Sequence, residues 1–466
     1  MKKLLRRLRL VCLCLGSIGT LMLISGLVLA LTLPPATPLP NLSRADEMID
    51  ARDYESAERE INEAIATNPE YPGSYYLLAV LNYRQKDYEE ALRNARKALD
   101  LTTPDNVKGL EQAVLLVQNT LWALGRYGEA CNVSSEMIRI MPDNAAGYVN
   151  RALSECELGD YPQAVADCDK AIELDPQIPE AYHNRALAYL NQNMFEKCIS
   201  DCVTAIQLRS GDAVPYINRS QAESYLGRLD EALADADKAV QLDPTNAKAY
   251  LSRSLANTFL HEYDKSVADC KRALSLEPNN ADAYGALSYI YAMQDKPEEA
   301  LGYAEKMIRV DPSDPAGYES RASALIGLKQ YEKAEADCEK ALTLDPRCFR
   351  AYDDVGTIHL ETGDYPRAIG ALSESLEIYP ENKSALMKRA KALFLEGDFD
   401  RAIVDLSELI SLDPDNWNVY YNRGVSNEKA GRLQEAISDY MTAVKLAPDN
   451  PTPRQALRNL GVDGYE

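Results

Sequence analysis

The sequence contains few of the residues from which catalytic and metal sites are usually built. It has only three histidines in 466 residues, at positions 183, 261 and 359, and they share no common spacing. A glycine-rich phosphate loop and a Gly-x-Ser-x-Gly turn are also absent. We therefore expect no catalytic residues, no cofactor and no bound metal, and the protein is not expected to be an enzyme.

Basic residues are scarce relative to acidic ones. Fifty lysines and arginines stand against 72 aspartates and glutamates, which gives a formal net charge of −22 and a pI near 4.7. Because no basic stripe is present to neutralise phosphates, we expect no nucleic-acid partner. The acidic excess indicates either a well-solvated surface or a basic protein partner, and composition does not decide between them.

Long uncharged stretches are also missing, with one exception at the start of the chain. Residues 1–9 form a basic flank, and the run from Leu10 to Leu33 has 24 residues without a charge. This length is enough to span the hydrocarbon layer of a membrane, which is about 30 Å thick.

Two interpretations of the run compete. A secretory signal has an apolar core of about 7–15 residues, shorter than this one, and Val28-Leu29-Ala30 is only a passable cleavage site. We therefore favour an uncleaved transmembrane signal-anchor over residues 10–33. Its basic flank predicts a cytoplasmic N-terminus and an extracytoplasmic remainder in a single-pass cell-membrane protein, joined through a stiff proline-rich linker at residues 34–40.

The rest of the chain repeats one unit. Nine prolines fall on a single 34-residue grid that lacks proline only at Ser210: Pro142, Pro176, Pro244, Pro278, Pro312, Pro346, Pro380, Pro414 and Pro448. A fixed period of this length is typical of a stacked array. Each period contains two amphipathic stretches of helical spacing, such as Tyr148 to Leu158 and Pro162 to Leu174. Each unit is therefore predicted to be a helix hairpin.

Small residues recur at fixed places in this unit. With Ala145 taken as position 1, positions 8 and 20 hold alanine, serine, glycine or cysteine from Ala152 and Ala164 onward. Helices approach closely only where contact residues lack bulk, so these positions are predicted to lie where helix backbones cross.

This pattern resembles the tetratricopeptide repeat, and the resemblance extends over residues 38–450. The matching residues in the clearest copy are Tyr148, Ala152, Gly159-Asp160-Tyr161, Ala164, Ala171 and Pro176. We place twelve repeats at 38–71, 72–103, 111–144, 145–178, 179–212, 213–246, 247–280, 281–314, 315–348, 349–382, 383–416 and 417–450, and a capping helix and tail at 451–466. The resemblance implies an all-α solenoid, a right-handed superhelix whose first helices line a concave groove.

Ten cysteines raise the alternatives of disulfides or a metal site. Cys168, Cys202, Cys270 and Cys338 share position 24, where other repeats place apolar residues such as Ile61, Ala95, Ala236, Leu372 or Leu406. A position that accepts alanine, leucine or cysteine is a packing position, and a free cysteine behaves there as a small buried hydrophobe. Unpaired buried thiols fit an oxidising compartment poorly.

Arginine at position 7 and an acid at position 23 occur together or are absent together in all twelve repeats. Such residues are most simply in contact, and we predict ion pairs between the two helices of one hairpin. The pairs are Arg151–Asp167, Arg185–Asp201, Arg219–Asp235, Arg253–Asp269, Arg321–Asp337, Arg389–Asp405 and Arg423–Asp439, with Arg44–Glu60 in the first repeat.

These arginines are therefore assigned to architecture and not to a ligand. The carboxylate clamp of heat-shock co-chaperones, which the resemblance would imply for a chaperone receptor, is incomplete here. Asn218 and Lys248 match two of its residues, but Ser252 replaces the arginine, and His183 and Leu187 replace the first lysine and asparagine.

The resemblance leaves the inner groove as the predicted binding surface for a protein or peptide partner. The candidate residues are Val149, Leu153, His183, Leu187, Ile217, Leu251, Leu255 and Tyr289. The alternative is that these side chains pack against the neighbouring first helix. Two functions remain: a membrane-anchored scaffold with its repeats outside the cytoplasm, or a chaperone or import receptor with cytosolic repeats. The sequence leaves homo-oligomers open.

Overall fold

The computed structural model describes residues 42–103 and 105–462, and every regular element in these two ranges is an α-helix. The predicted membrane segment at 10–33, its basic flank, the linker at 34–40 and the last residues of the tail lie outside the described part of the chain. None of the described helices is long and apolar enough to cross a membrane.

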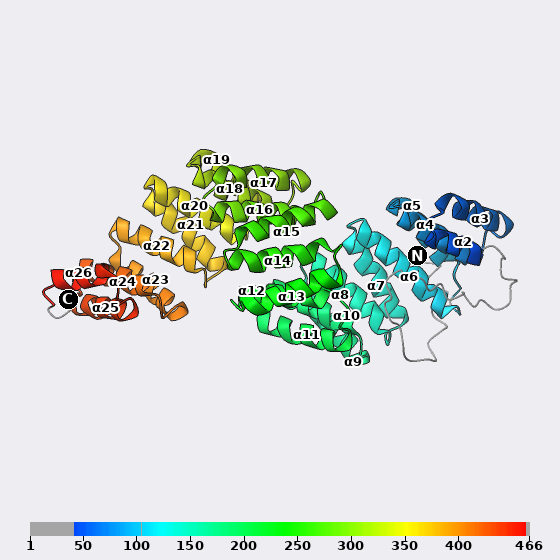
Figure 1. Ribbon diagram of the computed structural model, residues 1–466, viewed down its shortest axis with the longest axis horizontal. Coiled ribbons are helices and arrows are strands. Elements are labelled where there is room, and N and C mark those ends of the chain that lie inside the picture. Colours follow the sequence, from blue (N-terminus) through cyan, green and yellow to red (C-terminus); the bar gives the residue numbers. More distant parts are fainter. Residues whose placement is uncertain (1–41, 104, 463–466) are drawn as a thin grey trace. The chain divides into compact units, whose positions relative to one another are not determined.

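The described residues divide into two units, up to Pro244 and from Thr245. The first unit contains six hairpins in which consecutive helices pack side by side (Figure 1). Its helices are α2 (Leu42–Asp50), α3 (Tyr54–Thr67), α4 (Pro72–Arg84), α5 (Tyr88–Leu101), α6 (Val107–Ala123), α7 (Tyr127–Ile140), α8 (Ala145–Glu157), α9 (Tyr161–Leu174), α10 (Pro179–Asn191), α11 (Phe195–Leu208), α12 (Val214–Tyr225) and α13 (Leu229–Leu242).

The second unit contains six further hairpins and a final short helix. Its helices are α14 (Ala247–Phe259), α15 (Tyr263–Leu276), α16 (Ala281–Met293), α17 (Pro297–Val310), α18 (Pro315–Gly327), α19 (Tyr331–Leu344), α20 (Phe349–Thr362), α21 (Tyr365–Ile378), α22 (Lys383–Glu396), α23 (Phe399–Leu412), α24 (Trp417–Lys429), α25 (Leu433–Leu446) and α26 (Pro451–Asn459). The all-α solenoid of tetratricopeptide-like repeats predicted from the sequence is confirmed.

Every hairpin turns at one residue with a left-handed backbone. Six hairpins place glycine there, as at Gly159 with φ of 78°, and the other six use residues with a Cβ atom, as at Lys329 with φ of 57°. An aspartate one residue later often caps the second helix, as Asp160 does by accepting a hydrogen bond from the Gln163 amide at 3.3 Å. The short turn between helices is therefore encoded locally.

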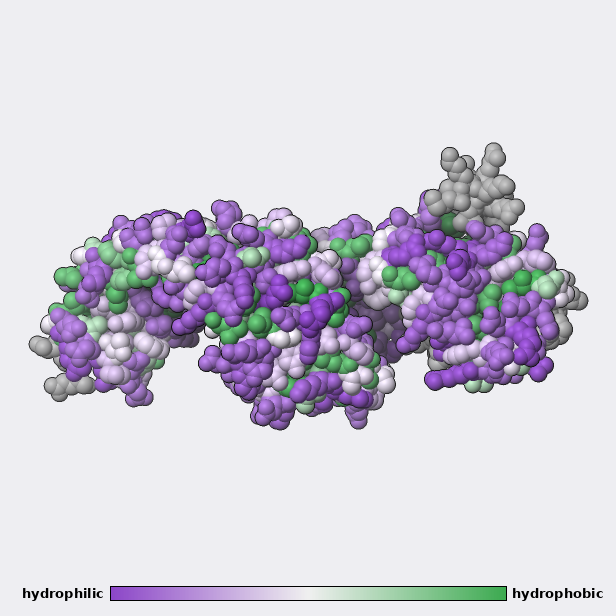
Figure 2. Space-filling model, turned by 90° about the horizontal axis from the view of Figure 1, so that it is seen from above, coloured by the Kyte–Doolittle hydropathy of each residue, from purple (hydrophilic) through white to green (hydrophobic). Residues whose placement is uncertain are grey.

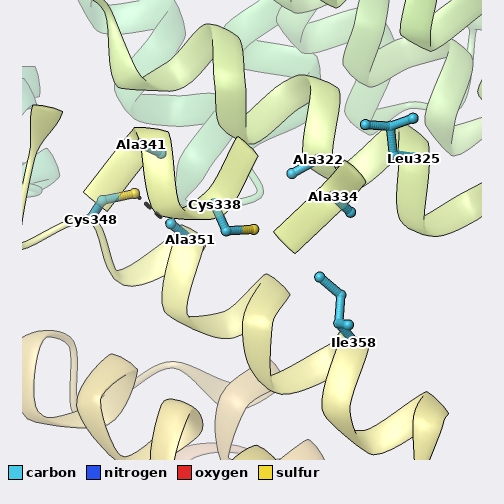
Figure 3. Close-up of a cluster of buried hydrophobic side chains, with 8 residues drawn as sticks. All are labelled: Ala322, Leu325, Ala334, Cys338, Ala341, Cys348, Ala351 and Ile358. Atoms are coloured by element: carbon cyan, nitrogen blue, oxygen red, sulfur yellow. Dashed lines mark hydrogen bonds between the residues drawn. The ribbon is translucent and has the colours of Figure 1, made fainter. Parts of the chain in front are cut away.

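The core is a series of small clusters between neighbouring helices. One of them gathers side chains from α18, α19, α20 and the residue before α20 (Figure 3): Ala322, Leu325, Ala334, Cys338, Ala341, Cys348, Ala351 and Ile358. Cys338 is fully buried there and has no disulfide partner, as a packing residue would be. Because each cluster is shared only by adjacent elements, stability is distributed along the array.

Helix α26 covers the end of the last hairpin. Leu457 is fully buried against Tyr440 and Val444 of α25. The remaining face of α26 carries polar residues, so the last hydrophobic face is shielded from water.

Candidate functional site: ion-pair clasps and the first-helix faces

The structure brings each position-7 arginine together with the aspartate at position 23 of the same repeat. In all seven pairs the arginine Nε and Nη2 donate two parallel hydrogen bonds to the two carboxylate oxygens, with lengths of 2.5–3.0 Å. Arg44 and Glu60 of the first repeat lie 3.3 Å apart. This fork geometry joins the two helices of a hairpin.

The remaining arginine nitrogen makes a contact that the sequence comparison missed. Nη1 of Arg151 donates to Ser135 at 3.1 Å, and Nη1 of Arg185 donates to Asp169. Both acceptors lie at position 25 of the preceding repeat, and Arg389 and Arg423 reach serines at the same position. One guanidinium therefore connects three helices. This arrangement, an arginine with its aspartate in the same repeat and its acceptor at position 25 of the preceding repeat, is called an ion-pair clasp, and it also fixes one repeat against the next.

Aromatic rings support the same guanidinium groups. In the six repeats that have tyrosine at position 4 and arginine at position 7, the arginine lies over the ring, with 5.7–6.0 Å between the guanidinium carbon and the ring centroid. At this distance a cation–π attraction of the order of 0.5–1 kcal/mol is expected at a partly exposed site. The arginine side chains therefore already have several partners within the fold.

Three of the four repeats without the ion pair have another side-chain contact between their two helices. Gln118 of α6 donates to Ser134 of α7, and Asn94 of α5 donates to Asn82 of α4 at 3.0 Å. In the eighth repeat the ring of Tyr303 stacks on that of Tyr291, with centroids 5.4 Å apart and planes 4° apart. A contact between the two helices is therefore preserved when its chemistry changes.

Position 11 also faces position 23, which sequence reasoning did not identify. Glu155 and Glu223 are buried at position 11, and each has a carboxylate oxygen without a hydrogen-bond partner. Burial, followed by the adjacent aspartate at position 23, raises the pKa of Glu155 and of Glu223 to about 7. In the last repeat the neutral Asn427 occupies this position and donates to Asp439 at 3.0 Å.

The predicted groove residues of the first unit are mostly enclosed. Val149 and Ile217 are buried, each only 4% exposed, and Leu153, His183 and Leu187 are half-buried. The Asn184 amide donates to the Val149 carbonyl at 3.2 Å, and the Asn218 amide donates to the His183 carbonyl at 3.3 Å. These bonds draw successive first helices together, and Val149 and Ile217 pack in the core.

The half-buried His183 lies close to charged side chains. Its Nδ1 lies 3.6 Å from Asp212 and makes no hydrogen bond. Burial lowers the pKa of His183, against the opposing effect of Asp212. Within residues 42–103 and 105–462, no three histidine, cysteine or acidic side chains come close enough together to hold a metal ion.

The predicted groove residues of the second unit are more accessible. Leu251 and Leu255 are half-buried, and Leu251 packs against the cluster of Cys270, Leu287 and Ile290. Tyr289 is 52% exposed and Met293, one helical turn later on α16, is 48% exposed. Exposed apolar residues lie within a mainly hydrophilic surface, as Figure 2 shows for one view of the molecule. The first-helix face of this unit is the candidate interaction surface.

Solved structures that match this chain include the following two. The crystal structure of the APC/C hetero-tetramer Cut9–Hcn1 matches with a TM-score of 0.50 and 11% identity, and it covers 91% of this chain and 96% of that chain. A structure from the functional characterization of Pseudomonas aeruginosa pilF matches with a TM-score of 0.40 and 19% identity over 47% of this chain and 98% of that chain. The likeness to Cut9–Hcn1 shows the fold alone. Among curated proteins, none matches this sequence.

Family profiles of the tetratricopeptide repeat match most of the array. Profiles described as tetratricopeptide repeat match residues 42–106, 179–212, 213–246, 247–280, 270–302, 319–383, 354–406 and 387–451, and one described as TPR repeat matches 153–193. Together these matches extend over more than half of the chain. The protein therefore belongs to the tetratricopeptide-repeat family.

Proposed function

We propose that this protein is a non-enzymatic scaffold that binds partner proteins or peptides on the faces formed by its first helices. The proposal is carried by one observation: the position-7 arginines are used by the fold, whereas apolar side chains such as Tyr289 remain exposed on a first helix. Exposed apolar residues on a rigid helical face suit the apolar side chains of an extended or helical segment.

Photocrosslinking from the full-length protein tests this proposal. A benzophenone side chain replaces the half-buried Leu255 or the exposed Tyr289 on the first-helix face, and Val404 on the second helix α23 serves as the control because it is exposed as Tyr289 is. We expect protein adducts from positions 255 and 289 that are absent from position 404. Equal labelling from all three positions would contradict a binding surface on the first helices.

We further propose that residues 10–33 tether the scaffold to a membrane with the repeats on the extracytoplasmic side. The uncharged run and its basic flank support this arrangement. Protease added to intact cells is expected to digest the repeats. Protection of the repeats until the cells are broken would instead support the receptor with cytosolic repeats.

A further inference from the structure

The first-helix face of α16, α18 and α20 combines exposed apolar side chains with carboxylates that are incompletely neutralised. Successive residues of an α-helix are rotated by about 100° around the helix axis, so repeat positions 5, 6, 9 and 13 fall within an arc of about 100° and share one face of the helix. Tyr289 and Met293 occupy positions 9 and 13 of α16, Glu319 occupies position 5 of α18, and Asp353 and Asp354 occupy positions 5 and 6 of α20. Because α18 packs beside both α16 and α20, these residues belong to one succession of neighbouring helices.

The three carboxylates have unequal partners. Lys388 of α22 lies 3.2 Å from both oxygens of Asp353, and Glu319 accepts a hydrogen bond from the Cys348 thiol at 2.6 Å. Asp354 makes no hydrogen bond or ion pair with another described residue. Burial, then the charge of Asp353, raises the pKa of Asp354 to about 7, although Lys388 and Arg350 oppose the shift. The site therefore has room for another positive charge.

The corresponding face of the first unit does not offer this combination. There, positions 5 and 6 are occupied by uncharged residues, and Asn184 and Asn218 at position 6 donate to backbone carbonyls of the preceding first helix. The acidic character is thus a property of particular repeats in the second unit and not of the repeat itself.

The spacing of the helices sets the length of a ligand that could contact both the exposed apolar side chains of α16 and the carboxylates of α18 and α20. Packed helices lie about 8–10 Å apart, so a ligand that crosses from α16 to α20 spans roughly 20 Å. An extended chain covers this distance with about six residues.

We infer that this face binds an unstructured segment of a partner protein in which lysine or arginine lies within about six residues of an apolar side chain. The apolar side chain packs on Tyr289 and Met293, and the cation pairs with Glu319 and Asp354. This inference rests on the proposed scaffold function and specifies the chemistry of the partner. The negative charge of this face selects a positively charged partner segment, and the exposed apolar residues supply contact area.

Random displayed peptides about twelve residues long, selected on the full-length protein, provide the probe. The test variant is Glu319→Gln with Asp354→Asn. The control, Glu339→Gln with Glu374→Gln, removes the same charge from exposed positions on the second helices of the same two repeats. A third variant, Tyr289→Ser with Met293→Ser, removes the apolar contact, and circular dichroism melting checks that all variants fold.

We expect the selected peptides to carry lysine or arginine near an apolar residue, and their binding to weaken with added salt. Their Kd should rise about tenfold or more in the Glu319/Asp354 variant, because a charge-assisted hydrogen bond contributes about 1.5–3 kcal/mol. The control variant should bind like the unmodified protein.

Two outcomes would overturn the inference in different ways. Selected peptides without a cation, or with unchanged affinity for the Glu319/Asp354 variant, would remove the charge requirement while binding through Tyr289 and Met293 preserves the scaffold function. An absence of selected peptides, or binding that is insensitive to the Tyr289/Met293 variant, would count against the scaffold function at this face as well.

Discussion

Arg185 of α10 and Asp201 of α11 are joined by two hydrogen bonds of 2.7 Å each, one from Nε and one from Nη2. The same guanidinium also donates to Asp169 of the preceding repeat. The two aspartates differ in burial, since the side chain of Asp201 is 9% exposed and that of Asp169 is 55% exposed. This difference separates the contribution of a buried partner from that of a surface partner.

Asp201→Ala is expected to destabilise the surrounding repeats by about 3 kcal/mol, because it leaves a guanidinium partly buried without its main acceptor. Asp169→Ala should cost less than about 1 kcal/mol, since exposed ion pairs contribute little. Hydrogen exchange of the α10 and α11 amides measures the effect locally, as repeat arrays open in parts. Equal effects of the two substitutions would contradict the assignment of Asp201 as the structural partner.

The buried glutamates predict an unusual pH dependence. The pKa of Glu155 is raised to about 7 in the fold, above its usual value of 4.5, so the protonated form stabilises the folded state. This stabilisation is fully present below pH 4.5 and is lost as the pH rises through 7. Glu155→Gln should therefore be more stable than the unmodified protein at pH 8, by about 1–3 kcal/mol, and similar to it near pH 4.5.

Thermal denaturation at the two pH values measures this difference, and Glu223→Gln should behave in the same way. The reciprocal control is Asn427→Glu, which introduces a carboxylate at the same repeat position beside Asp439. It should make stability fall as pH rises. If Glu155→Gln shifts the melting temperature equally at both pH values, the neutral state of Glu155 in the fold is contradicted.

The sequence predicted the hairpins and the Arg–Asp contacts because both follow from comparison within one repeat. It did not reveal that Arg185 reaches Asp169, because position 25 varies widely among the repeats and includes aspartate, glutamate, serine, valine, lysine and methionine. The candidate groove residues include both the exposed Tyr289 and the buried Val149, and the repeat pattern alone does not distinguish them. Exposure depends on how closely adjacent helices approach, and the asparagine-to-carbonyl bonds that set this distance link different repeats.

The hairpin turns offer a stabilising substitution. Lys329 has a left-handed backbone with φ of 57°, a conformation that glycine adopts without the steric cost imposed by a Cβ atom. Lys329→Gly should therefore raise stability by up to about 1 kcal/mol, measured as an increase in melting temperature. The matched reverse change is Gly159→Lys: its added Cβ meets no other atom within 4 Å, so any loss of stability reports backbone strain. A decrease in stability for Lys329→Gly would contradict this explanation.

Gly356 of α20 lies against Leu372 of α21. Substitutions at these two positions test whether the side-chain sizes at repeat positions 8 and 24 compensate one another. A Cβ atom added at Gly356 would lie 2.5 Å from Cγ of Leu372, so Gly356→Ala should overpack the site and cost about 1–3 kcal/mol.

Three other repeats combine alanine at position 8 with cysteine at position 24, as in Ala322 and Cys338. The double substitution Gly356→Ala with Leu372→Cys recreates that combination. It should be more stable than the sum of the two single effects predicts, because the smaller thiol provides the space that the new methyl group fills. Additive losses in thermal denaturation would show that the two positions do not compensate one another in volume.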